Sequence, residues 1–231
     1  MCSASCSPCD HGSPAAGRQS VHGVPMAPPR CPPGQAACVV RTGAGAGVLC
    51  IKASRVSGRG RLLGQDRAAQ ALLARARVAL ALLKARAAHR HLAAAVFDAV
   101  DIQLQVTPDP ASRLHCEAWP VSPAQARDGD LALFLALASL FSGRPLRGGL
   151  VCAAAVDARG QLQRAGDAAL AVAAALQAGR HTLLLPLKSR PALELACGPA
   201  LRCLWLATVD EALREALPES GTVVLGATAA G

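Results

Sequence analysis

The sequence predicts a single mixed domain of the α+β class, with strands and helices built around a common core. Strand-like and helical segments alternate between residues 37 and 217, which is typical of mixed α/β architecture. Hydrophobic residues make up 52% of the 231 residues, enough for a packed core, although only 2% are aromatic. We find no internal repeat, and the length suits one large domain or two small ones.

Composition divides the chain into three regions. Residues 1–36 are rich in Ser, Pro, Gly and Cys and lack apolar periodicity, which predicts a disordered leader. The leader has no continuous apolar stretch, so it is not a secretory signal, and its two arginines make a poor mitochondrial transit helix. Residues 37–217 form the predicted domain, and residues 218–231 are a C-terminal tail.

The first half of the domain begins with strands. Two strands are expected at 37–41 and 47–56 around a glycine-rich turn. A long helix follows over 66–91, because leucine and alanine recur along one stripe. Two more strands are expected at 101–107 and 114–119, and the Pro-Asp-Pro link between them favours a hairpin.

The second half begins with a very apolar helix. It is expected over 129–141 and ends at Ser142-Gly143. The remaining predicted elements are, in order, a strand at 149–156, a helix at 167–178 closed by Gly179, strands at 182–187 and 201–207, and a helix at 210–217.

The net charge of +9 is concentrated at the N-terminal end. Residues 1–100 hold 13 basic and 3 acidic side chains, whereas residues 101–231 hold 11 and 12. Such asymmetry can attract nucleic acid or an acidic partner. A bias toward Arg together with abundant Ala is also what a GC-rich genome produces. The longest apolar run, 131–141, is far shorter than the roughly 20 residues of a membrane span, so no membrane partner is expected.

Ten cysteines are present, and four of them lie within the first 31 residues. The others are scattered through apolar segments, which is typical of buried thiols in a reducing compartment. We therefore expect an intracellular protein, with the cytoplasm favoured and the mitochondrion as the alternative location. Cys2, Cys6 and Cys9 have the spacing of a radical-SAM cluster site, but no barrel of eight βα units follows. We favour an unstructured leader and expect no metal or cofactor.

Basic residues flank the apolar stripe of the 66–91 helix on both sides. Arg77 and Lys84 share one row, and Arg75 and Arg86 share another, roughly opposite. This distribution indicates aliphatic stems that lie over a buried stripe with their charged ends in water. A nucleic-acid face would gather the cations on one side and interleave aromatic residues for base stacking.

Several short motifs occur in a specific order over residues 37–217. They are Gly58-Arg59-Gly60-Arg61-Leu62 after a strand, Leu114-His115-Cys116-Glu117, Arg127-Asp128-Gly129, Ser142-Gly143-Arg144-Pro145, Arg159-Gly160-Gln161-Leu162 and Thr182-Leu183-Leu184-Leu185-Pro186. In this order and spacing they resemble the proteolytic domain of the Lon protease family. The resemblance implies a single mixed α/β domain of the ribosomal protein S5 domain 2-like type.

The resemblance also implies a serine nucleophile and a lysine base within hydrogen-bond reach of each other. Counting from Asp128 and Gly129, the nucleophile position falls on Leu131, and Asp130 replaces a small proline. Counting back from the 182–186 strand, the base position falls on Ala169. We therefore expect no catalytic residue, with Asp128 and Gly129 as remnants of an active-site loop.

Neighbouring polar groups do not restore this pair of residues. Three alanines at 153–155 replace the family's Thr-Gly-Glu. Ser139 is interpreted as a small polar residue near a helix end, and Lys188 as a solvated loop residue. No Gly-x-x-x-x-Gly-Lys-Ser/Thr loop is present, so this sequence contains no ATPase site of that kind.

Three functions remain open. The first is a non-catalytic pseudo-protease with an assembly or scaffold role, acting as a homo-oligomer or with a protein partner. The second is an active ATP-dependent Lon-type serine endopeptidase whose motif register differs from the one above. The third is a nucleic-acid-binding Lon-like domain, as in RadA proteins.

Overall fold

The computed structural model describes residues 32–42, 45–87, 94–112, 123–164, 166–192 and 199–217. The strands are β1 (Gln35–Thr42), β2 (Gly45–Ser57), β3 (Leu62–Gly64), β4 (Val100–Pro108), β5 (Leu150–Cys152), β6 (Ala155–Val156), β7 (Leu162–Gln163), β8 (Thr182–Pro186) and β9 (Arg202–Leu206). The α-helices are α1 (Arg67–Arg86), α2 (Pro123–Ala126), α3 (Asp130–Ser142), α4 (Ala168–Gln177) and α5 (Val209–Ala216). Three short 3₁₀ segments are η2 (Ala94–Phe97), η4 (Arg127–Gly129) and η5 (Leu187–Ala192).

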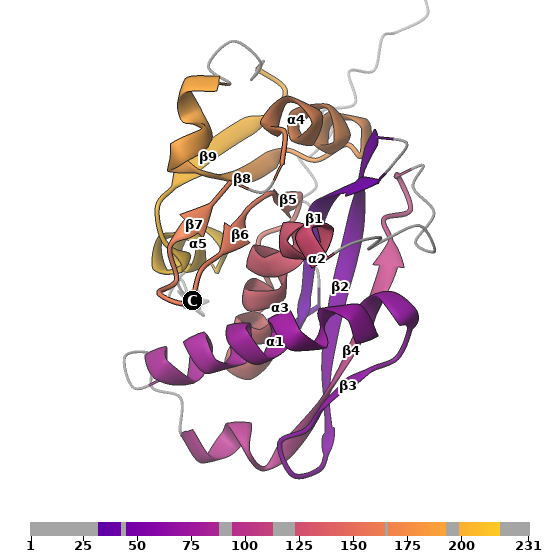
Figure 1. Cartoon of the computed structure of the whole chain (residues 1–231), viewed down its shortest axis with the longest axis vertical. Helices are drawn as coiled ribbons and strands as arrows, with labels where there is room; N and C mark the ends of the chain where they lie inside the picture. Colours follow the sequence, from indigo (N-terminus) through magenta and orange to yellow (C-terminus); the bar gives the residue numbers. More distant parts are fainter. Residues whose placement is uncertain are drawn as a thin grey trace, which may run out of the picture.

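One large mixed sheet organises these elements (Figure 1). Its seven strands lie in the order β3-β4-β2-β1-β5-β8-β9, and β6 and β7 form a separate two-stranded ribbon. β2 pairs antiparallel with both β1 and β4, while the other pairs of the large sheet are parallel. This arrangement confirms the predicted mixed α/β fold class.

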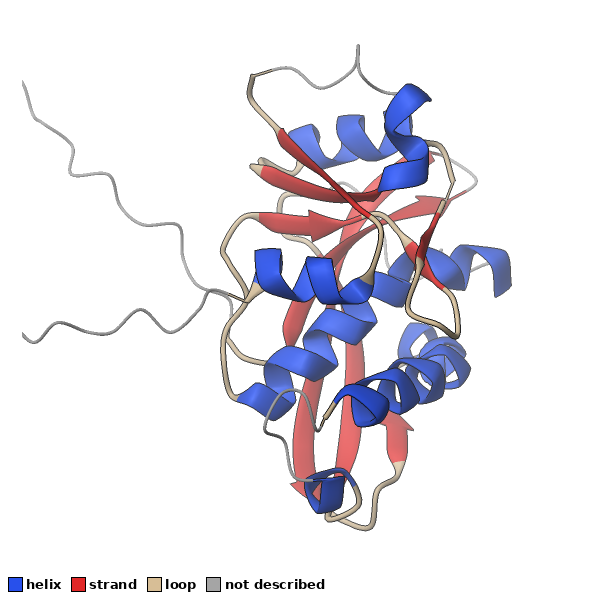
Figure 2. Cartoon of the chain, turned by 90° about the vertical axis from the view of Figure 1, so that its left-hand side faces the viewer, coloured by secondary structure: helices blue, strands red, loops and turns tan. Residues whose placement is uncertain are grey.

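Helices pack against the sheet (Figure 2), and side chains from both faces of its strands are buried. Alternate residues of a strand point to opposite faces, so Cys38 and Val40 of β1 join one hydrophobic cluster while Ala37 and Val39 join another. Residues of α1, α3 and α5 complete the first cluster, and residues of α4 complete the second. α3 and α4 therefore pack into different parts of the core.

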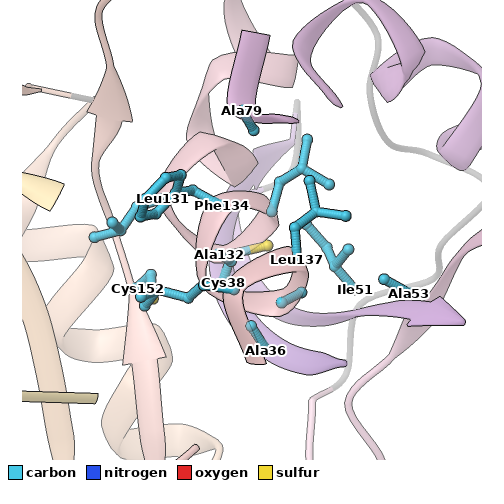
Figure 3. Close-up of a cluster of buried hydrophobic side chains, with 14 of the residues drawn as sticks. Ala36, Cys38, Ile51, Ala53, Ala79, Leu131, Ala132, Phe134, Leu137 and Cys152 are labelled. Atoms are coloured by element: carbon cyan, nitrogen blue, oxygen red, sulfur yellow. The ribbon is translucent and has the colours of Figure 1, made fainter. Parts of the chain in front are cut away.

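Helix α3 is the centre of the first cluster. Each residue from Leu131 to Leu137 is 0% exposed. A helix that is apolar on all sides has to be surrounded by protein, and Leu131, Phe134 and Leu137 lie among side chains of β1 and β2 in Figure 3. The helix ends at Gly143, whose left-handed conformation (φ 65°) caps it as the sequence predicted.

The glycine-arginine turn between β2 and β3 is organised around a buried carboxylate. The backbone N–H groups of Arg59 and Arg61 donate to Asp101 Oδ1 at 2.7 and 2.9 Å, and Arg61 Nε donates to Oδ2 at 2.9 Å. These hydrogen bonds, led by that from the Arg61 backbone, lower the pKa of Asp101 to about 2. A Cβ on Gly58 would lie 2.0 Å from Asp101 Cγ, so the turn requires glycine there. The motif therefore positions edge strand β3.

Two predicted boundaries were wrong. The strand expected at 149–156 is split into β5 and β6, because the chain leaves the sheet between them: Ala154 C=O accepts from Leu131 N–H at 3.3 Å. The helix expected over 66–91 ends at Arg86, and Asp66 is its N-cap, accepting from Ala69 N–H.

Several predictions fall wholly or partly outside the described residues. They concern residues 1–31 of the leader, with its four cysteines, the strand at 114–119 with its hairpin, and the tail at 218–231. The last two residues of the predicted leader, Gln35 and Ala36, are described and belong to β1. Within the described part of the chain, no helix is long and apolar enough to cross a membrane.

Candidate functional site

Two buried aspartates mark the segment that leads into α3. Asp128 lies in η4 and is 1% exposed, and Asp130 is the first residue of α3 and is 4% exposed. A buried carboxylate is stable only with hydrogen-bonding or charged partners. Each of these two carboxylates is held by an arginine from a different element.

Arg41, on β1, holds Asp128. Its Nε donates to Oδ2 at 3.0 Å and its Nη2 to Oδ1 at 3.1 Å, while its backbone N–H donates to Oδ2 at 3.2 Å. Gln125 Nε2 donates to the Arg41 C=O at 3.1 Å, which ties α2 to the same strand end. Burial raises the pKa of Asp128, and the hydrogen bonds from Arg41 oppose that rise.

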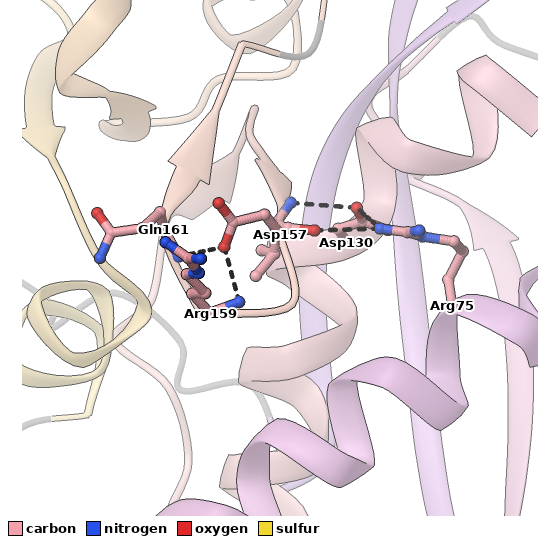
Figure 4. A network of polar contacts seen from close by, with 6 residues as sticks. Arg75, Asp130, Asp157, Arg159 and Gln161 are labelled. Carbon is pink, nitrogen blue, oxygen red and sulfur yellow. Dashed lines mark hydrogen bonds and ion pairs between the residues drawn. The ribbon is translucent and has the colours of Figure 1, made fainter.

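Arg75, on α1, holds Asp130 (Figure 4). Its Nε donates to Oδ1 at 2.7 Å and its Nη2 contacts Oδ2. Val156 N–H also donates to Oδ2 at 3.1 Å, and the Val156 C=O accepts from Arg75 Nη2 at 3.1 Å. Burial raises the pKa of Asp130, and the hydrogen bonds from Arg75 oppose that rise. This bridge joins α1, α3 and β6.

Little space remains beside the Asp130 carboxylate. The cavity there measures about 10 Å³ and is lined by Arg75, Val78, Ala79, Leu82, Asp130, Phe134 and Val156. A volume of that size holds roughly one water molecule. A peptide substrate could not enter between α1 and the start of α3 without moving these side chains.

The two positions predicted from the motifs to correspond to the family's nucleophile and base lie on helices. Leu131 is in the first turn of α3, where its side chain is 0% exposed and its N–H donates to Ala154 C=O at 3.3 Å. Ala169 is in the first turn of α4, is exposed, and its N–H donates to Asp167 Oδ1 at 2.8 Å. Neither side chain can donate or accept a proton.

The three alanines at 153–155 are buried at 6%, 0% and 1% exposure. Ala153 and Ala154 lie between β5 and β6, and Ala155 begins β6. The chain passes the N-terminus of α3 here through the Leu131–Ala154 hydrogen bond. Their methyl side chains could form no hydrogen bond with a lysine at the predicted base position, which is Ala169 in this chain.

Ser139 and Lys188, weighed as substitutes, both have structural partners. Ser139 is 0% exposed, and its Oγ accepts from Gly34 N–H at 3.1 Å and donates to Arg144 C=O. It fixes the end of α3 against the start of β1, which agrees with the structural interpretation. Lys188 is exposed, and its Nζ donates to Gln163 Oε1 at 3.0 Å. Among the described residues, no group of three or more His, Cys, Asp or Glu could hold a metal ion.

Sequence reasoning missed the roles of the arginines. The prediction that the charged ends of Arg75 and Arg86 lie in water was wrong. Arg75 binds Asp130, and Arg86 Nε donates to Asp210 at 3.0 Å while Nη2 donates to Arg159 C=O at 3.1 Å. The Arg75–Asp130 pair is separated by 55 residues and the Arg41–Asp128 pair by 87, so no local pattern could reveal either.

Comparison with known proteins shows which family the domain resembles. The family model of the Lon protease (S16) C-terminal proteolytic domain matches residues 27–219. The chain is 30% identical over 190 residues to a Lon protease of Paraburkholderia phytofirmans, which covers 81% of this chain and 22% of that protein. It is 29% identical over 187 residues to a Lon protease of Methylocella silvestris, covering 80% of this chain and 22% of that protein.

A third relative matches with similar identity and coverage. A Lon protease of Phenylobacterium zucineum is 28% identical over 195 residues, covering 83% of this chain and 23% of that protein. The chain spans about a fifth of the length of these relatives. The match between family model and chain extends through the sheet, α3 and α4, and the chain belongs to the family of Lon protease C-terminal proteolytic domains.

Proposed function

We propose that this chain is a non-catalytic member of the Lon proteolytic family that acts as an assembly or scaffold module. The observation that carries the proposal is the buried Arg75–Asp130–Val156 network at the start of α3. It occupies the segment where the family resemblance places the nucleophile and its small neighbour.

The chemistry of the side chains supports the loss of catalysis. Attack on a peptide carbonyl needs a nucleophilic oxygen or sulfur and a base that removes its proton. Leu131 offers a hydrocarbon, and Ala169 offers a methyl group. Asp130 places a carboxylate one residue from the nucleophile position, where negative charge would oppose the oxyanion that develops during acyl transfer.

The hydrogen bonding of the segment supports the same conclusion. A catalytic site keeps donors aimed at the position where charge will develop. Here the Leu131 N–H already donates to Ala154 C=O, and both aspartates are held by arginines. The Leu131 N–H and the two arginines therefore have partners within the protein.

The retained core supports a structural role. α3 is fully packed and the seven-stranded sheet is complete from β3 to β9, so the fold persists without the residues of the dyad. A domain of this kind can hold a partner protein, or other copies of the chain, in a fixed geometry. The molar mass of the purified chain, measured by light scattering, distinguishes these two forms. Self-assembly gives a multiple of 23.5 kDa, whereas a mass of 23.5 kDa at all concentrations means that the partner is a different protein.

The proposal is tested by incubating the purified chain with casein, with and without ATP. We expect no fragments above those of a heat-inactivated sample, because polarisation of a carbonyl without an attacking group leaves rates orders of magnitude below those of a protease. Cleavage that is lost on replacing one serine by alanine would establish instead the active endopeptidase with a different register.

A further inference from the structure

A groove with a volume of about 460 Å³ lies between edge strand β3 and helix α1, away from the segment that precedes α3. It is lined by Gly60, Arg61, Leu62, Leu63, Arg77, Leu80, Ala81 and Lys84. One wall is the backbone of an edge strand and the other is an exposed helix face that carries two cations. A groove of this construction suits an extended chain rather than a compact small molecule.

The backbone of β3 presents unused pairing positions to the groove. β3 is the last strand at its end of the described sheet and pairs only with β4. Ile102 N–H donates to Arg61 C=O at 2.8 Å, and Gln65 N–H donates to Leu104 C=O at 2.8 Å. Because successive residues of a strand direct their backbone groups to alternate sides, those of Leu62 point to the outer edge. An added strand could pair there.

The charges of the groove favour an anionic occupant. Lys84 Nζ lies 2.7 Å from Asp98 Oδ1, and Arg61 Nη2 lies 2.8 Å from Asp101 Oδ2. Arg77 is exposed and forms no ion pair with another described residue. Of the three cations that line the groove, two are therefore already paired, and Arg77 has no ion-pair partner among the described residues. Asp98 and Asp101 lie beside these cations, so a ligand with few and widely spaced carboxylates is repelled less than a phosphate backbone, which carries one charge per nucleotide.

The apolar lining separates a peptide from a nucleic acid. Leu62 packs against the core, and Leu80 is 7% exposed, so the groove has an aliphatic floor. No aromatic side chain lines it, so it offers no platform for base stacking. Aliphatic contacts together with an open strand edge are the elements of peptide recognition by strand addition.

We propose that this groove binds an extended acidic polypeptide segment of a partner protein, which adds a strand to the outer edge of β3 and directs a carboxylate toward Arg77. The assignment rests on the scaffold role proposed above and gives that role a location. It does not depend on the degenerate dyad positions.

The test is a fluorescence-anisotropy titration of the full chain with a labelled, end-capped peptide of eight alternating Glu and Val residues. Saturable binding is expected, and a matched Lys-Val peptide should bind at least about tenfold more weakly because its charge is reversed. Arg77→Glu should weaken binding of the acidic peptide by about tenfold or more. Arg202→Glu makes the same charge change at the exposed start of β9, the opposite edge of the sheet, and should leave binding within about twofold.

Two further probes test the strand pairing and the class of ligand. N-methylation of every second amide blocks one edge of the peptide strand. Methylation of the edge that faces β3 should abolish binding, whereas methylation of the other edge should preserve it, because a strand pairs through one edge. Equal binding of the two methylated forms, or equal losses from Arg77→Glu and Arg202→Glu, would overturn the proposal. A 12-nucleotide single strand that binds more tightly than the peptide, and that loses affinity with Arg77→Glu, would overturn it in favour of nucleic acid. If the chain cleaves casein and still binds the peptide, only the proposed loss of catalysis is wrong. If it neither cleaves casein nor binds the peptide, only the proposed peptide binding in this groove is wrong.

Discussion

The segment at 128–131 and the groove between β3 and α1 use charge in opposite ways. In the segment, Asp128 and Asp130 are buried and each is bound by an arginine, with about 10 Å³ of space beside Asp130. In the groove, Arg77 is exposed and faces a volume of about 460 Å³. A buried charge with internal partners supports the fold but is not available to a ligand. An exposed charge adds little to stability and remains available for binding.

Removal of the Asp130 carboxylate should have the largest effect on stability. Asp130→Ala leaves the Arg75 guanidinium and the Val156 N–H without their partner, and we expect a loss of about 3–5 kcal/mol in the free energy of unfolding. Urea denaturation followed by circular dichroism measures this loss. Asp98→Ala, which breaks the exposed pair with Lys84, is the matched control and should cost less than about 1 kcal/mol. Equal losses would mean that the buried network does not hold the segment.

The two dyad positions should respond very differently to substitution. Leu131→Ser places a hydroxyl in a fully packed site and should cost about 2–4 kcal/mol. Ala169→Lys changes an exposed position on α4 and should stay within about 0.5 kcal/mol. The double variant, measured by denaturation and by casein cleavage, should be unstable and inactive, since Asp130 and the alanines at 153–155 leave the new residues without polar support. Cleavage by the double variant would show that only the dyad had been lost.

The glycine-arginine turn should tolerate no side chain at Gly58. A Cβ there would lie 2.0 Å from Asp101 Cγ, so Gly58→Ala should cost about 1–3 kcal/mol by displacing a buried carboxylate. Ser57→Ala, at the exposed neighbouring residue, should change stability by less than about 0.5 kcal/mol. If Gly58→Ala is neutral, the turn does not constrain β3 as described.

The smallest expected effect is on the pH dependence of stability. The pKa of Asp101 is about 2 in the folded protein, below its usual range of about 4, so the unfolded chain binds more protons between these values. Stability from Asp101 is therefore present above about pH 4 and is lost as the pH falls toward 2. Urea midpoints measured from pH 5 to pH 2.5 should fall less steeply for Asp101→Asn than for the unchanged chain. Parallel curves would contradict the hydrogen bonding of the turn.

The sequence predicted the parts of this molecule that depend on local pattern. The strand later found as Thr182–Pro186, the helix Asp130–Ser142 and its Gly143 cap all follow from periodicity and turn chemistry. β3 was missed because its three residues are too few to show a period. The arginine partners of Asp128 and Asp130 were missed because pairing across 87 and 55 residues is decided by tertiary packing. Leu131 and Ala169 were located by counting from motifs, and their assignment as dyad positions stays a prediction.

The most direct test of the central claim is labelling of the purified, folded chain with a fluorophosphonate probe that reacts with activated serines. Only a serine paired with a base reacts, because an ordinary hydroxyl is a weak nucleophile. We predict no labelling above that of a heat-denatured sample, and no change with Ser139→Ala, since that hydroxyl is bound to Gly34 and Arg144. Stoichiometric labelling that disappears when one serine is replaced by alanine would contradict the account and show an active peptidase.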